Sequence, residues 1–298
     1  MKSWKEDILG SQDFAVDNHG IIHGTVNSTD SYLFHKNYTK GAHLRKLKEK
    51  KFHQIYWETP YYLKILNSFL NKDDFNEMLF LDFGCGDGRI TQYLLENHAE
   101  KIVCVDFDYA TLVSLSEYLE DNQLTDKVMM LYTDYENLVL PHGKFDLILA
   151  IGVLYYLNEK YESALRNFRS LLKHEGRLIL SDPDLEGSLL RMLLYDSLES
   201  AIEAFKLRRF KETKNQSEFH FRIFDEKEWK SIFARVGFAI DGKRKISLFH
   251  NIIRVLQIKG IITENQLEKN EADIWEILNY LHEHGSLSKH IVWSLIRK

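Results

Sequence analysis

The sequence has 298 residues, of which 44% are hydrophobic and 28% are charged, and its formal net charge at pH 7 is -5. This composition excludes a disordered chain and suits one sizeable domain with appendages, or two small ones. Two cysteines make no disulfide framework, residues 1–7 are too polar for a secretory signal, and no apolar run is long enough to span a membrane. We therefore expect a cytoplasmic protein with no membrane contact.

Helices are predicted before the first strand, from residue 42 onward. Residues 1–40 show little periodicity, whereas residues 42–56 form a basic helical pattern. Thr59 followed by Pro60 is typical of a helix start, for a helix that runs to about Leu70.

Apolar strands and helical segments then alternate. Strands are predicted near residues 78–83, 102–106, 128–132, 145–151 and 176–182, with helices near 88–97, 109–121 and 160–173. This order predicts an α/β fold with a doubly wound, parallel sheet.

The last third of the chain is expected to complete this sheet and then to continue as helices. A helical insertion at 185–211 is followed by a helix at 225–236 and by two finishing strands at 237–242 and 244–249. From Ile252 onward the pattern is helical, and Ser286 is placed to cap a final helix.

The turn after the first strand is the most informative feature. Glycines at positions 84, 86 and 88 let the backbone approach a ligand closely. A dinucleotide fingerprint needs its third glycine at position 89, which is Arg89. Asp82 and Asp87 would repel a pyrophosphate, but they suit an ammonium and a sulfonium, while the N–H groups of the helix start suit a carboxylate. S-adenosylmethionine carries all three groups.

The ends of the next two strands add ligand contacts. Asp106 lies 22 positions after Gly84 (106 - 84), close to the spacing of a ribose-binding carboxylate. Phe107 is placed to cover an adenine face, and Asp134 can accept a hydrogen bond from the adenine amino group. The alternatives are a plain strand-end cap for Asp106 and, for Asp134, the N-cap of a short helix, a role that can coexist with ligand binding.

As a set, these features resemble the class I S-adenosylmethionine-dependent methyltransferases, which have a Rossmann-like sheet. The glycine turn, Asp106, Asp134, the fourth and fifth strands and the stretch 228–238 match that family in order and spacing, over about residues 75–250. The resemblance implies a mostly parallel, seven-stranded sheet with an antiparallel last strand. It also implies S-adenosyl-L-methionine as cofactor and S-adenosyl-L-homocysteine as product.

The resemblance also implies roles for individual residues. Asp106 would hold the ribose, Phe107 would pack on adenine, Asp134 would bind its amino group, and the turn would pass beneath the methionine moiety. The full set expected at the cofactor is Asp82, Gly84, Cys85, Gly86, Asp106, Phe107, Asp134, Tyr135 and Ile151. Cys85 and Cys104 also suit buried packing positions.

We expect three segments along the chain. These are an N-terminal helical lid at 1–74, the cofactor-binding domain at 75–250 with its helical insertion at 185–215, and a C-terminal helical extension at 251–298. The extension is a candidate for a homodimer interface or for part of the lid. Because ligands bind beyond the carboxyl ends of the strands, Tyr155 and Tyr156 are expected at the substrate, together with Tyr38 from the lid. Tyr155 either donates a hydrogen bond there or only lines the pocket.

His220 and Arg222 are the candidates for catalysis and substrate binding. They alternate with Phe219 and Phe221 in a strand-like stretch, so both point to one face. His220 suits a general base and Arg222 an anion clamp, and the alternative is a solvated face over a packed aromatic pair. Basic clusters within 36–51, 206–214 and 243–245 would attract an anion if they converge, and are otherwise solvated surface.

These features favour methyl transfer to a small anionic molecule, with oxygen as the preferred acceptor atom. An RNA methyltransferase is disfavoured by an isoelectric point of about 6.2, and a catalytically silent cofactor-binding or assembly protein is a further alternative. The exit Ala150-Ile151-Gly152 lacks the Asn/Asp-Pro-Pro turn of enzymes that methylate adenine or glutamine amino groups. Asp182 and Asp184 alone are a poor magnesium site, so no metal is expected.

Overall fold

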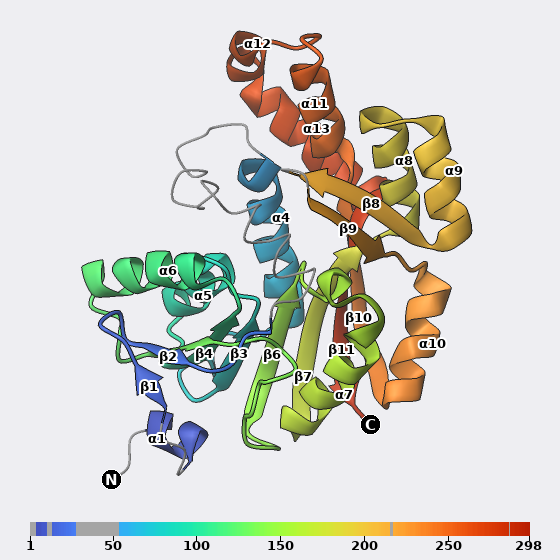
Figure 1. Cartoon of the computed structure of the whole chain (residues 1–298). Helices are drawn as coiled ribbons and strands as arrows, with labels where there is room; N and C mark the ends of the chain where they lie inside the picture. The colour runs from blue at the N-terminus through green and yellow to red at the C-terminus, as the bar shows by residue number, and fades with distance from the viewer. Residues whose placement is uncertain (1–3, 11–13, 28–53, 215–216, 286) are drawn as a thin grey trace.

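The computed structural model describes residues 4–10, 14–27, 54–214, 217–285 and 287–298. A nine-stranded sheet in the order β1-β2-β5-β4-β3-β6-β7-β11-β10 crosses the molecule, with helices on both faces (Figure 1). The predicted α/β class and doubly wound arrangement are confirmed, although the sheet has two strands more than the expected seven. Tyr38 and most of the predicted basic helix at 42–56 lie outside the described residues.

Five parallel strands form the predicted centre of the sheet. They are β3 (Leu79–Phe83), β4 (Lys101–Asp106), β5 (Val128–Tyr132), β6 (Phe145–Ile151) and β7 (Leu172–Pro183). Their apolar runs follow from burial on both faces of the sheet. The connecting helices α5 (Arg89–Glu96), α6 (Tyr109–Asp121) and α7 (Tyr161–Leu171) lie where the sequence places them.

The side chains of the strands alternate between two helical layers. Leu81 and Val103 face the layer of α7 and α10 (Glu226–Val236), whereas Phe80 and Ile102 face the layer of α4 (Gln54–Phe69), α5 and α6. This alternation is the period of two of an extended chain. The core therefore lies on both sides of the sheet, and the carboxyl ends of its parallel strands stay free to form a site.

The C-terminal strand β11 (Ser288–Arg297) is the main correction to the sequence prediction. It inserts between β7 and β10 (Phe238–Ser247) and is antiparallel to both, so the predicted final helix is wrong. Ser286 itself lies outside the described residues. A strand that is buried on both faces has no alternating polar pattern, and a short, mostly apolar run such as 291–295 is equally compatible with a helix.

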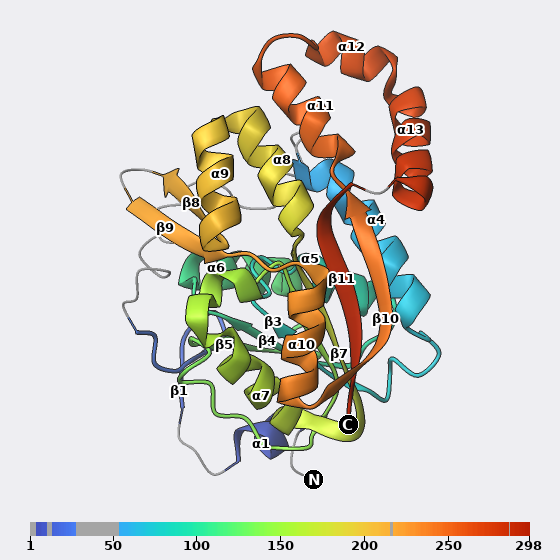
Figure 2. The ribbon, with the colours of Figure 1, turned by 90° about the vertical axis from the view of Figure 1, so that its right-hand side faces the viewer.

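The predicted finishing strands at 237–242 and 244–249 are one strand, β10, with a register shift between Ile240 and Gly242. Three helices then separate β10 from β11: α11 (Phe249–Ile258), α12 (Glu264–Lys269) and α13 (Glu271–His284). They rise beyond the end of the sheet (Figure 2) and pack on α4 around Trp57. The helical extension is therefore an excursion between two strands of the sheet.

Helix α4 also differs from its prediction at one end. It includes Gln54, and Pro60 lies inside it, so Thr59 does not start a helix. Tyr62 of this helix packs on the sheet. Trp57 and Tyr61 pack in a cluster with Ile253 of α11. The helix lies beside the sheet, within the segment that the sequence predicts as a lid.

The insertion contains helices and a hairpin. Helices α8 (Leu185–Tyr195) and α9 (Leu198–Leu207) precede the antiparallel strands β8 (Arg209–Lys214) and β9 (Ser217–Arg222). The extended conformation around His220 is confirmed. Among the described residues, no helix combines the length and apolar character needed to cross a membrane.

The N-terminal segment adds a helix and two short strands at the sheet edge. Helix α1 (Trp4–Leu9) is followed by β1 (Ala15–Val16) and β2 (Ile21–His23), and β2 pairs in parallel with β5. Elements this short carry no detectable sequence period. Beyond β2, the chain runs over the end of β5 toward the site.

Candidate functional site

The glycine turn between β3 and α5 has the backbone conformation that its sequence predicts. Gly84, Gly86 and Gly88 have φ angles of 70°, 56° and 90°, in the left-handed region that side chains disfavour. A Cβ added to Gly84 would lie 2.5 Å from a methyl group of Val153, whereas one added to Gly86 would meet no atom within 4 Å. The turn is therefore packed against the exit of β6 at Gly84 and faces open space at Gly86.

Asp106 connects this turn to the end of β4. Its Oδ2 accepts a hydrogen bond of 2.8 Å from the Gly86 N–H, and its Oδ1 accepts one of 2.9 Å from the Asp108 N–H. Burial raises the pKa of Asp106 to about 7, against the opposing effect of these two backbone hydrogen bonds. Each carboxylate oxygen keeps acceptor capacity, so Asp106 can also bind a pair of hydroxyl groups.

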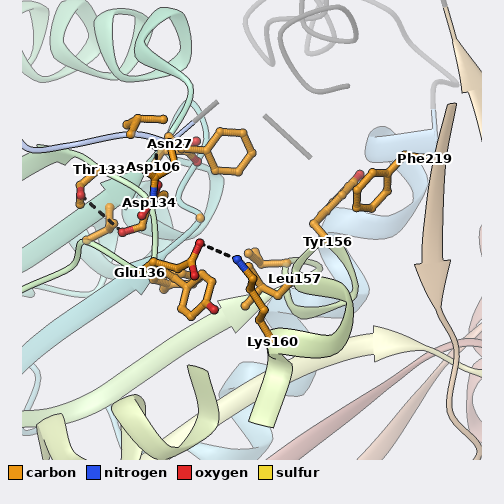
Figure 3. Close-up of a pocket in the computed structure, with 16 residues that line it drawn as sticks. Asn27, Asp106, Thr133, Asp134, Glu136, Tyr156, Leu157, Lys160 and Phe219 are labelled. Carbon is orange, nitrogen blue, oxygen red and sulfur yellow. Dashed lines mark hydrogen bonds and ion pairs between the residues drawn. The ribbon is translucent and has the colours of Figure 1, made fainter. Parts of the chain in front are cut away.

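A first cavity of about 250 Å³ opens beside Asp106, beyond the carboxyl ends of β3, β4 and β5. Asn27, Asp106 and Asp134 lie on one side of it, and Tyr156 and Phe219 lie on the other (Figure 3). The predicted cofactor residues that line it are Gly84, Asp106, Phe107, Asp134 and Tyr135. The sequence analysis did not predict the other lining residues Val26, Asn27, Phe83, Val105, Thr133, Glu136, Val153, Leu157, Lys160 and Phe219.

Asp134 anchors the N-terminal segment at the rim of this cavity. Its Oδ2 accepts a hydrogen bond of 2.7 Å from the Asn27 N–H, and its Oδ1 accepts bonds of 2.9 and 2.8 Å from the backbone and side-chain nitrogens of Asn137. Thr133 donates to the Thr25 carbonyl at 2.9 Å. No helix begins at Asp134, so the N-cap alternative is wrong.

Asp82 and Cys85 are buried, and neither belongs to the wall of the first cavity. Asp82 is 2% exposed and accepts a hydrogen bond of 2.7 Å from the Thr91 hydroxyl. Burial raises the pKa of Asp82 to about 6. At these two positions the structure does not bring the predicted side chains to the ligand space.

A second, more polar cavity of about 200 Å³ adjoins the first at Tyr156, which lines both. Its wall is assembled from five parts of the fold. They are α4 (Glu58, Tyr62), the start of α5 (Arg89), the exit of β6 with the 3-10 helix η1 (Leu154–Lys160), the end of β7 with α8 (Gly187, Ser188, Arg191) and β11 (Lys289, His290). Of the predicted residues, Ile151, Tyr155 and Tyr156 line it.

Glu58 is the centre of a buried charge network at this second cavity. Its carboxylate contacts the ammonium group of Lys289 and accepts a hydrogen bond of 2.9 Å from His250 Nε2. Burial alone would raise the pKa of Glu58, but the charge of Lys289 and the hydrogen bond from His250 outweigh it and hold this pKa well below its usual value. Glu58 is therefore ionised and balances Lys289.

His290 adds a neutral polar group to the same wall. Its Nδ1 lies 2.6 Å from the Tyr62 hydroxyl. Burial, and next the charge of Lys289, lower the pKa of His290 well below its usual value. Arg89, Arg191 and Lys289 bring positively charged side chains to the wall of this cavity, and Glu58 balances Lys289.

His220 and Arg222 do not reach either cavity. His220 is exposed on the face of β9 opposite to Phe219, whose ring lines the first cavity. Arg222 lies 3.7 Å from Glu159 and its guanidinium lies 5.4 Å from the Phe224 ring centre. This arrangement matches the alternative of a solvated face over packed aromatic side chains, and it does not support the proposed base and clamp.

Comparison with known proteins finds similarity in the central part of the chain. Residues 81–178 match a family model described as a methyltransferase domain. A stretch of 115 residues is 31% identical to protein arginine N-methyltransferase 1 of Saccharomyces cerevisiae, which covers 38% of this chain and 32% of that protein. The chain thus spans about a third of the length of this curated relative.

Solved structures share the fold. An S-adenosylmethionine-dependent methyltransferase from Methanosarcina mazei superposes with a TM-score of 0.53 at 16% identity, over 78% of this chain and 98% of that chain. The 1,6-didemethyltoxoflavin-N1-methyltransferase of Burkholderia thailandensis, which contains S-adenosylhomocysteine, superposes with a TM-score of 0.52 at 15% identity, over 90% of this chain and 84% of that chain.

Proposed function

Since residues 81–178 form a class I, Rossmann-like methyltransferase domain, whose cofactor is S-adenosylmethionine, we propose that this chain transfers a methyl group to an oxygen atom of a small anionic molecule. The observation that carries the proposal is the pair of adjoining cavities. One has the groups that a nucleoside needs, and the other has the charges that an anion needs.

The first cavity fits the nucleoside part of the cofactor. Asp106 would accept hydrogen bonds from both ribose hydroxyls while the Gly86 and Asp108 N–H groups hold its carboxylate in place. Phe107 and Tyr135 would border the adenine, and Asp134 would accept from its amino group. The open space at Gly86 leaves room for the amino acid part.

The second cavity supports an anionic acceptor. Arg89, Arg191 and Lys289 line it together with one carboxylate, that of Glu58. An alkyl amine acceptor is a cation at neutral pH, and these charges would repel it, whereas they would attract a carboxylate, a phosphate or a phenolate. This difference favours oxygen over an amino nitrogen.

The transfer itself asks little of the side chains. S-adenosylmethionine supplies, when bound, a methyl group on a positively charged sulfur. The electron pair of the acceptor oxygen forms the new O–C bond while the S–C bond breaks and its electron pair stays on sulfur. An oxygen that is already ionised brings no proton to remove, so the residues around Tyr156 need only align the acceptor and exclude water, which can contribute about 7–11 kcal/mol.

A second candidate is methylation of a guanidinium nitrogen. The similarity to a yeast arginine N-methyltransferase favours it, although the aligned stretch is 38% of this chain. A guanidinium is a cation, and Arg191 and Arg89 would oppose its entry into the second cavity. We therefore place it after the anionic acceptor.

Transfer of a labelled methyl group tests the proposal. The full chain is incubated with S-adenosylmethionine labelled in the methyl group and with cell extract divided into small acids, small bases, protein and RNA. We expect label in the small acids, and much less of it when Asp106→Asn replaces the wild type at a limiting concentration of S-adenosylmethionine. Label in protein arginine would establish the second candidate, and label in RNA would refute a small acceptor.

A further inference from the structure

We propose that the exposed face of helix α9 is an interface at which two copies of this chain associate, with the two helices antiparallel across a twofold axis. The occupant of this face is thus a second copy of the chain. The face consists of an apolar stripe and two charged residues along one edge of it, none of which lines either cavity: Leu198, Ile202, Phe205, Glu199 and Lys206.

Helix α9 lies on the outer side of the insertion, with α8 between it and α11 (Figure 2). Its main contacts are with α8 and β8. Ala201 and Ala204 are buried in a cluster with Met192 of α8, so this side of α9 faces the rest of the same copy. The side of the helix away from these two alanines is exposed.

The exposed side of α9 carries a continuous apolar stripe. Leu198, Ile202 and Phe205 are 59%, 44% and 55% exposed, and their spacing of four and three residues places them in one line. The guanidinium of Arg208 lies 5.1 Å from the ring centre of Phe205, yet more than half of this phenylalanine stays in solvent. Single exposed apolar residues are common, whereas a line of three large ones is typical of a surface that a partner covers.

Charged residues along one edge of the stripe indicate which partner it is. Glu199 follows Leu198 and Lys206 follows Phe205, so the two charges lie on the same edge, seven positions apart (206 - 199). Both side chains are exposed, and neither has an ion-pair partner within the described part of the chain. In an antiparallel pair with its twofold axis near Ile202, this edge faces its own copy, so Glu199 of each copy meets Lys206 of the other. The helix is therefore complementary to itself in this orientation.

The parallel orientation lacks this complementarity. With the two helices parallel, the charged edge of each would face the opposite edge of the other, where Ala201 and Ala204 are already buried. The antiparallel orientation also places the partial positive end of each helix beside the partial negative end of its copy. Because α9 has 10 residues and is thus about 15 Å long, the interface is small, and we expect a dissociation constant in the micromolar range.

Sedimentation equilibrium of the full chain at low salt, from roughly 1 to 300 µM, tests the interface. We expect the wild type to pass from monomer to dimer over this range. Ile202→Asp removes the apolar side chain at the centre of the stripe and brings two negative charges together at the axis. This variant should weaken association about 100-fold or more, because the change occurs in both copies.

Reversal of the two charges tests the antiparallel arrangement. Glu199→Lys and Lys206→Glu each turn two attractive pairs into two repulsive ones, and each should weaken association about tenfold, which is about 1.4 kcal/mol. The double variant exchanges the two charges and should associate as tightly as the wild type. Glu276→Lys on α13 is the matched control, because Glu276 is an exposed helical glutamate outside α9 and its reversal should leave association unchanged. Thermal unfolding checks that each variant is folded.

Several outcomes would overturn this assignment. A wild type that stays monomeric over the whole range has no such interface, and a wild type that associates as well as Ile202→Asp or as either single reversal uses another surface. A double variant as weak as the single ones would refute the antiparallel pairing. If Glu276→Lys weakened association as much as the reversals on α9, the interface would lie on the helices α11 to α13 instead. Association restored in the double variant completes the expected result.

Discussion

Replacement of Asp106 by Asn is the sharpest test of the cofactor site, because it keeps the shape of the side chain and removes its charge. The carboxylate accepts hydrogen bonds from the N–H groups of Gly86 and Asp108, one on each oxygen. An asparagine has one oxygen and one NH2 group, so one of these two N–H groups loses its acceptor. The variant therefore perturbs the turn as well as the ligand contact.

The expected size follows from these contacts. A hydrogen bond to a charged group contributes about 1.5–3 kcal/mol, and about 1.4 kcal/mol corresponds to a factor of ten in affinity. Loss of the charged acceptor beneath the ribose should therefore weaken S-adenosylhomocysteine binding about 10- to 100-fold. The unsatisfied backbone N–H destabilises the folded protein by a further amount of about 1–3 kcal/mol. This cost is the same with and without bound ligand, so it lowers the stability of the protein more than its affinity.

Calorimetric titration with S-adenosylhomocysteine at pH 6 and pH 8 measures this effect. Since burial raises the pKa of Asp106 to about 7, the wild type gains the ionised acceptor as the pH rises through this value, and its affinity should increase from pH 6 to pH 8. Asp106→Asn cannot ionise and should lack this increase.

A neighbouring residue provides the control for this titration. Asp108 accepts a hydrogen bond of 3.0 Å from the Ala110 N–H at the start of α6 and does not line the first cavity. Asn caps a helix about as well as Asp, so Asp108→Asn should stay folded. Because the charge of Asp108 also raises the pKa of Asp106, this variant is compared at pH 8, where it should bind like the wild type. If Asp106→Asn bound within threefold of the wild type at pH 8, the assignment of the ribose ligand would be refuted.

Two further predictions concern stability. The pKa of buried Asp82 is about 6 in the folded protein and 3.8 in the unfolded chain. This difference stabilises the folded protein fully below pH 3.8, and the stabilisation, up to about 3 kcal/mol, is lost as the pH rises through 6. Between pH 4.5 and 7.5, urea unfolding of Asp82→Asn should lack most of this loss, and parallel pH profiles for variant and wild type would contradict it. Trp293 in β11 is 0% exposed, so Trp293→Ala should lower the free energy of unfolding by about 3–5 kcal/mol. Tyr280→Ala on α13, where the side chain is 62% exposed, should change it by less than about 0.5 kcal/mol, and equal effects of the two variants would show that β11 is not part of the core.

At His220 the structure does not support the predicted catalytic role. Alternation in β9 predicted that His220 and Arg222 share one face, and they do, but the opposite face is the one that meets the cavity, through Phe219. A period of two separates the faces of a strand without telling which of them packs against a neighbour. That choice depends on how the hairpin lies on η1 and α9.

The sequence by itself determined the five parallel strands, the glycine turn and the place of Asp106, Phe107 and Asp134 beside it. These features depend on local patterns and short spacings: a strand needs a run of apolar residues, and the turn needs glycine at positions with positive φ. The carboxyl ends of neighbouring parallel strands lie at the same edge of the sheet, so the residues that follow these strands come close together.

Only the tertiary structure decided the insertion of β11 and the composition of the second cavity. Glu58 meets Lys289 across 231 positions of the sequence, and Arg191 joins them from a helix that is itself an insertion. No local pattern encodes such contacts, because a buried ion pair forms only where burial, sheet register and helix packing bring opposite charges together. The residues around the first cavity were therefore readable from the chain, whereas the charges of the second cavity came together only once the chain was folded.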